Sequence, residues 1–347
     1  MIKILSFGGM KPKIDRSMLY ISMVVNVIAL IVALGLLIEL KAEDRISVPR
    51  GCALSLLGFV YFMSLYEACV EAALSTASGA RFRTQFRLGQ GDVMDICNKV
   101  VSAVQAAFSC VTGAVVCLWS CTRDFVRTSH VVSEGYAWFG AAYFFYDIYS
   151  MYMVHVHMIS DGALKSKIRR LSKGGDAPLS VGDAKRERPT FLQYCRHEPV
   201  ILMHHLFIGG FGFLVIVYLR GGLGDCVFGF VYLMELSTPF VSARGILSRL
   251  RLKATRAYVV NGIAMLLTFF VCRVASLPYV CLMYSRVLGL PYLEAIKSLP
   301  LGCKVSMCIL LLPQLYWFCL MAAGAVRVLA PRAAARQLSA GDADKRS

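Results

Sequence analysis

Two adjacent histidines, His204 and His205, lie inside a long apolar run and could carry acid–base or acyl-transfer chemistry. Imidazole titrates near neutral pH, so it can accept a proton from an amine or first accept an acyl group. Neighbouring residues on a helix point about 100° apart, so both rings cannot squarely face one point. We expect one histidine to act on substrate while the other orients it or packs. The alternative, equally compatible with the spacing, is a pair of interfacial residues with satisfied hydrogen bonds.

Other ionisable side chains inside apolar runs are the next candidates, because a charge in hydrocarbon costs at least about 2.5–3.5 kcal/mol on insertion scales. Helix rise counted from the turn RGGLG places Glu235 within about 7–8 Å of the depth of His204. We expect Glu235 to orient a histidine or bind an amine, and Asp147, at nearly the same depth, to be a second acid. Asp147 and Arg273 are also compatible with structural links between helices, which we favour for Arg273.

Two further histidines, His155 and His157, lie at the end of the preceding apolar run, and His155 is near the depth of His204. The predicted catalytic residues are His204, His205 and Glu235. The predicted substrate-binding residues are Asp147, His155, His157 and Arg273. The sequence has no HExxH, GxSxG or Walker pattern, and we expect no metal. Its 13 cysteines lie mostly inside apolar runs and form no CxxC pair. We therefore predict neither a disulfide framework nor a zinc site.

The elements that position these residues are predicted to be transmembrane helices. The chain has 347 residues, of which 57% are hydrophobic and 17% charged, whereas a soluble domain carries about 25% charged residues. A spanning helix needs roughly 20 apolar residues. The sequence therefore predicts an all-α, multi-pass transmembrane bundle of about eight spans. The predicted spans are 18–40, 52–75, 95–119, 135–158, 200–219, 225–243, 258–283 and 305–326.

The basic residues divide unequally between alternate loops. Lys and Arg number 26 in the N-terminus, the second, fourth and sixth loops and the C-terminal tail, but nine in the other loops. Because basic loops remain cytosolic, eight spans place both termini in the cytosol. The net charge of +16 is thereby explained without nucleic acid, since no stretch interleaves basic residues with aromatic ones as a base-stacking surface would.

Four strings, in this order, resemble the TLC family: YFFYDIYSMYMVHVH, LMHHLF, LMELSTPF and PQLYWF. Within that family they are most similar to the subgroup called TLC domain-containing protein 3, over residues 52–330. The resemblance implies a six-helix core, formed by the third to eighth spans, that encloses a lipid-accessible cavity in the endoplasmic reticulum or Golgi membrane. The predicted divisions are an N-terminal anchor with the first span (1–50), a second helix and loop (51–92), the TLC domain (93–330) and a disordered cytosolic tail (331–347).

The resemblance extends to the ceramide synthases, whose paired histidines match His204 and His205. It implies N-acylation of a sphingoid base in ceramide metabolism, with acyl-CoA as co-substrate and no resident cofactor. The implied partners are membrane lipids, the sphingoid base and acyl-CoA, and a homo-oligomer is compatible with the sequence. Ceramide synthases carry aspartates in the following span. Near the first aspartate position this chain has Val231 and Tyr232, and Glu235 is the only acid left in that stretch.

That departure supports an alternative, a non-enzymatic protein that binds membrane lipids or regulates their composition. A transporter is a third class, and it would require half-helices broken near the middle of the membrane in two matching repeats. The long loop 159–199 begins with a helical pattern of apolar and basic residues, which fits either a helix on the membrane surface or a solvated one. A flexible linker is expected over 174–189, GGDAPLSVGDAKRERP.

Overall fold

The structure is a computed structural model that describes residues 16–172 and 189–344. All of the predicted linker except Pro189 lies outside these ranges. Over the described residues the chain is helical, with no strand. The helices are α1 (Ser17–Ile38), α2 (Val48–Ser75), α3 (Ala77–Phe86), α4 (Gln90–Ser120), α5 (Val131–Ser172), α6 (Phe191–His197), α7 (Pro199–Leu206), η2 (Phe207–Gly212), η3 (Val215–Leu219), α8 (Asp225–Leu233), η4 (Met234–Ser237), α9 (Thr238–Arg249), α10 (Arg256–Phe269), η5 (Phe270–Ala275), α11 (Ser276–Leu288), α12 (Tyr292–Ser298) and α13 (Leu301–Asp344).

Seven stretches of helix in the described residues are long and apolar enough to cross a membrane, and they coincide with seven of the predicted spans. Three of them are composite: α7 continues through η2 and η3, α8 through η4 into α9, and α10 through η5 into α11. The multi-pass helical bundle is therefore confirmed. The remaining predicted span, 135–158, lies in α5, whose many tyrosines lower its hydropathy.

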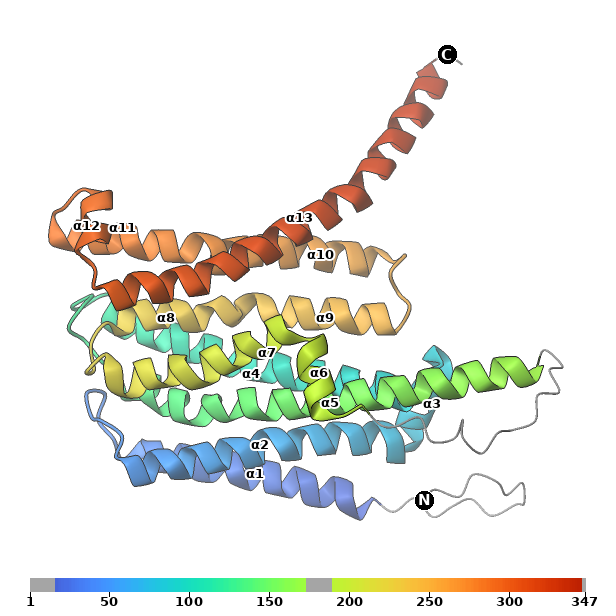
Figure 1. The fold of residues 1–347 in the computed structure, drawn as a ribbon, viewed down its shortest axis with the longest axis horizontal. Helices are drawn as coiled ribbons and strands as arrows, with labels where there is room; N and C mark the ends of the chain where they lie inside the picture. Colours follow the sequence, from blue (N-terminus) through green and yellow to red (C-terminus); the bar gives the residue numbers. More distant parts are fainter. Residues whose placement is uncertain (1–15, 173–188, 345–347) are drawn as a thin grey trace.

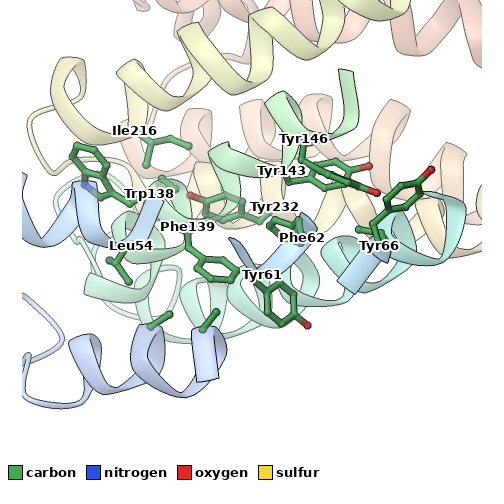
Figure 2. Packing of buried hydrophobic residues seen from close by; sticks show 14 of the residues in the cluster. Leu54, Tyr61, Phe62, Tyr66, Trp138, Phe139, Tyr143, Tyr146, Ile216 and Tyr232 are labelled. Carbon is green, nitrogen blue, oxygen red and sulfur yellow. The ribbon is translucent and has the colours of Figure 1, made fainter. Parts of the chain in front are cut away.

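Helix α5 runs alongside the other long helices through the middle of the bundle (Figure 1), in contact with α2, α4, α7 and η2. A helix surrounded by protein meets less lipid, so it can carry polar groups that a lipid-facing helix cannot. Its aromatic side chains form the core with those of α2. Phe62 of α2 packs against Phe139, Tyr143 and Tyr146 of α5, with ring centroids 5.3 to 6.3 Å apart (Figure 2). This aromatic core fixes the rotation of α5, and hence the direction of its polar residues.

The two sets of loops lie at opposite ends of the bundle, as alternating spans require. The turns that join α3 to α4 and α9 to α10 lie at one end, together with the start of α1, and the α1–α2, α4–α5 and α11–α12 connections lie at the other (Figure 1). The first set holds the larger share of Lys and Arg. We call the first the basic end and the second the disulfide end.

The disulfide end corrects one prediction, because Cys121 and Cys226 form a disulfide with their Cα atoms 4.9 Å apart. It joins the residue after α4 to the second residue of α8. Beside it, Asp225 is fully buried, pairs with Arg220 and accepts a hydrogen bond of 2.7 Å from the Ser133 hydroxyl. The two cysteines are 105 residues apart in sequence, and only the packing of α4 on α8 brings them together.

Helix α13 extends as far as Asp344, whereas the sequence predicts a disordered tail from 331. The segment is rich in alanine and arginine, which are among the strongest helix formers. Helix α5 likewise continues to Ser172, in keeping with the helical pattern at the start of the 159–199 loop.

Candidate functional site

The imidazole of His205 is held at both nitrogens by the protein. Its Nδ1 lies 2.8 Å from the carbonyl oxygen of Ile201, and its Nε2 lies 2.7 Å from Oδ2 of Asp147. Both side chains are buried, with residue exposures of 8% for His205 and 4% for Asp147. A carbonyl oxygen only accepts, so Nδ1 carries a hydrogen. The proton between Nε2 and the carboxyl group is then shared by a pair, written either as imidazolium and carboxylate or as imidazole and carboxylic acid.

The carboxyl group of Asp147 is itself fixed by α4. Asn98 donates from Nδ2 to Oδ1 of Asp147 at 2.8 Å. The other end of the amide, Asn98 Oδ1, accepts hydrogen bonds from the hydroxyls of Tyr146 at 2.9 Å and Ser150 at 2.6 Å. These bonds orient Asn98 so that its amide group can only donate to Asp147. A line of hydrogen bonds therefore runs from α4 through α5 to α7, and it holds the ring of His205 in one orientation.

His204 is left with free ring nitrogens. Its side chain is half-buried, and no hydrogen bond joins it to any residue in the described part of the chain. The ring meets Trp317 of α13 edge to face, with centroids 5.3 Å apart, and the ring of His205 lies 5.9 Å away. The adjacent histidines are thus differentiated by their surroundings: one is held by protein groups, and the other is available to a ligand.

Glu235 and Arg273 form a second pair rather than joining the histidines. Arg273 Nη2 lies 3.1 Å from Glu235 Oε1, and the Thr238 hydroxyl donates to Glu235 Oε2 at 2.5 Å. The guanidinium also donates to the carbonyl oxygen of Met234 at 2.9 Å and to Ser237 Oγ at 2.8 Å. Arg273 therefore links η5 to η4 and neutralises Glu235. The acid beside His205 is Asp147, not Glu235.

The two histidines of α5, His155 and His157, lie away from the His204–His205 pair. The ring of His155 packs on Tyr194 and His197, each with centroids 5.3 Å apart, where α6 meets α5 near the basic end. His157 lies on α5 beside the first turn of α4, where its backbone passes close to Gly91. Tyr194 is outside the spans, and burial together with the nearby Glu198 raises its pKa to about 12.

Three departures from α-helical geometry lie at or near the His205–Asp147 and Glu235–Arg273 pairs. The π-helical η2 begins two residues after His205, the 3-10 segment η4 contains Glu235, and the π-helical η5 contains Arg273. Such turns redirect side chains and are frequent at functional sites. Gly209 of η2 also permits close approach, because a Cβ there would lie 2.6 Å from Cβ of Phe144 on α5. Gly209 thus allows η2 to pack closely against α5.

Sequence reasoning missed Asn98. Its signal was an amide inside an otherwise apolar run, which needs a partner when buried. No group of three His, Cys, Asp or Glu side chains that could hold a metal occurs among the described residues. The site therefore offers a histidine with free nitrogens, a proton-holding histidine–aspartate pair and a neutralised glutamate–arginine pair, all within a membrane bundle.

These features define a multi-pass membrane protein with ionisable groups buried between its helices. The chain belongs to the TLC domain family, whose pattern matches residues 95–323. It is 32% identical over 134 residues to TLC domain-containing protein 4 of Homo sapiens, an alignment that covers 38% of this chain and 50% of that relative. The chain thus spans half the length of this curated relative. No solved structure matches the chain.

Proposed function

We propose that this chain is a ceramide-synthase-like N-acyltransferase of the endoplasmic reticulum or Golgi membrane, which joins the acyl group of acyl-CoA to a sphingoid base. The observation that carries the proposal is the contrast between His204, with free ring nitrogens, and His205, held by Asp147. A reactive group and an oriented, proton-holding neighbour are the usual parts of acid–base catalysis. The closer likeness to TLC domain-containing protein 3 belongs to the same proposal.

The proposed reaction forms a C–N bond and breaks the C–S bond of the thioester. The sphingoid ammonium first loses a proton to solvent and becomes a nucleophile. His204 accepts the second nitrogen proton as the amide forms, and returns it to the departing thiolate of CoA. The His205–Asp147 pair adjusts to the positive charge that develops on the neighbouring ring, because its own proton can move toward Asp147. Atoms and charges balance without another reactant.

The test uses the purified protein in detergent with sphinganine and a panel of acyl-CoAs, and detects ceramide by mass spectrometry. His204→Ala should lower the rate by about 10²–10⁴-fold, the usual contribution of a positioned acid–base group, without loss of thermal stability. His130→Asn is the matched control, because it removes a histidine of the α4–α5 connection that is none of the predicted site residues. Full activity of His204→Ala would overturn the assignment.

A second candidate function is a protein that binds membrane lipids without chemistry. It is favoured by the Glu235–Arg273 pair, because Glu235 is neutralised rather than free to bind an amine. The same experiment separates the two functions. If folded protein makes no ceramide with any acyl-CoA but retains a defined lipid through purification, lipid binding is the function that remains.

A further inference from the structure

A pocket of about 240 Å³ is lined by residues of α9, α10 and α13. Arg244 and Tyr258 form its polar side. The rest of the lining is apolar or glycine: Val259, Gly262, Ile263, Met265, Leu320, Met321, Gly324 and Ala325. Ile263 and Leu320 are exposed at 42% and 54%, so the pocket opens onto the outer apolar surface that faces lipid.

Arg244 brings an uncompensated positive charge into this pocket. No carboxylate in the described part of the chain lies within ion-pair distance of it, and no hydrogen bond to protein fixes its guanidinium. The guanidinium instead lies over the ring of Tyr258, 4.2 Å from the ring centroid. A side chain at Gly262 would collide with it, so the glycine provides the space in which Arg244 lies against α10.

The depth and the surrounding charge narrow the kind of ligand. Arg244 precedes the end of α9 by five residues and Tyr258 is the third residue of α10, which places both near the α9–α10 turn, at the level of lipid headgroups. The chain contains no Asp or Glu between Glu235 and Glu294, whereas the turn region adds further Arg and Lys. A guanidinium presents forked donors that match a phosphate, and the apolar walls match an acyl chain.

The geometry points to a binding site for the phosphate group of an anionic membrane amphiphile, with the phosphate on Arg244 and the chain along α10 and α13. An anionic phospholipid of the adjacent leaflet is the source that the lipid-facing opening favours. An acyl-CoA carries the same chemistry, and Leu320 lies only one turn from Trp317, which packs on His204. The site is independent of the proposed acyltransferase, because none of its lining residues belongs to the histidine or glutamate pairs.

The test measures binding to the full chain in neutral detergent by native mass spectrometry. The probes are dioleoyl phosphatidic acid, oleoyl-CoA and dioleoylglycerol, which has two oleoyl chains but no phosphate. Arg244→Gln should weaken phosphatidic acid binding about tenfold, the effect of losing one charge-assisted contact. Gly324→Leu should also weaken it, because the open space above this glycine would be filled. Lys253→Gln, which removes an exposed charge from the same turn, is the matched control and should bind as the wild type does.

Arg244-dependent binding of either phosphate-bearing probe supports the site, and the tighter of the two identifies its source. Equal binding by the wild type and Arg244→Gln overturns the proposal, as does dioleoylglycerol binding as tight as that of phosphatidic acid. Size-exclusion profiles and thermal unfolding establish that each variant is folded. The readout contains no turnover, so failure here leaves the ceramide assay of the histidine variants unaffected.

Discussion

Replacement of Asp147 offers the sharpest test of the hydrogen bonds that join Asn98 of α4, Asp147 of α5 and His205 of α7. In Asp147→Ala the Nε2 of His205 and the Nδ2 of Asn98 both lose their partner. In Asp147→Asn, the new amide oxygen can still accept from Asn98, while the new amide nitrogen can donate to an unprotonated Nε2. The asparagine therefore satisfies every hydrogen bond, provided that His205 is neutral with its hydrogen on Nδ1.

The expected magnitudes follow from this difference. Breaking a buried ion pair by removing one partner costs about 3–5 kcal/mol, and an unsatisfied buried donor costs about 1–3 kcal/mol. The free energy of unfolding of Asp147→Ala should therefore be lower than that of the wild type by about 3–5 kcal/mol or more. Asp147→Asn should lose no more than about 1 kcal/mol, since it changes charge but not shape. Acyl-transfer activity should not follow stability. Asp147→Asn should be folded but impaired in acyl transfer, because its neutral pair has no proton that can move in response to charge on His204.

The assay is thermal unfolding in detergent, followed by ceramide formation for each folded variant. A loss of this size lowers Tm by on the order of 10 °C. Glu43→Ala, which removes an exposed acid from the α1–α2 connection, is the control for the loss of a charge. Asp147→Ala as stable as the wild type, or Asp147→Asn as unstable as Asp147→Ala, would refute the hydrogen-bond reasoning. Asp147→Asn with full acyltransferase activity would show that the pair has only a structural role.

Three further predictions concern the frame around the site, each measured as Tm in detergent. Cys121→Ser should cost about 2–4 kcal/mol and abolish the response to reductant; an unchanged response would contradict it. Burial lowers the pKa of His130, whose Nδ1 accepts the Val132 N–H at 3.1 Å. Since the unfolded residue takes up a proton first, stability should fall as pH drops below about 6.5, and less steeply in His130→Asn; equal slopes would refute this. Gly209→Ala should lower stability by about 1–3 kcal/mol, because the added methyl group overpacks against α5. Gly210→Ala is the control, since a Cβ there meets open space and should cost little. Equal losses would exclude the close approach of Gly209 to Phe144.

The sequence predicts the features that depend on one segment at a time. Apolar length located the spans, and the cost of charge in hydrocarbon selected the buried ionisable residues. Counting helix rise also placed Asp147 and Glu235 at similar depth. It could not assign their partners, because that depends on the rotation of each helix about its axis. The aromatic contacts of Phe62 with α5 set that rotation, and they turn Asp147 toward His205.

The disulfide was missed for a related reason. Most cysteines of the chain lie inside apolar runs, where they pack as small hydrophobic residues. Cys121 and Cys226 differ because they lie at the ends of helices α4 and α8. The contact between these two spans cannot be predicted from the sequence of either one alone. Both cysteines lie at the less basic end, and the orientation predicted from the basic loops would expose that end to an oxidising compartment, where disulfides persist.

The distribution of partners among the buried ionisable groups explains why His204 is the residue on which the proposed chemistry depends. Asp147 is compensated by His205 and Glu235 by Arg273, so each pair can be buried without leaving a net charge in hydrocarbon. His204 has no such partner, but a neutral imidazole costs far less to bury than a charge. Its ring nitrogens are free of partners among the described residues, which suits a residue that takes a proton from an amine and passes it on to a leaving thiolate.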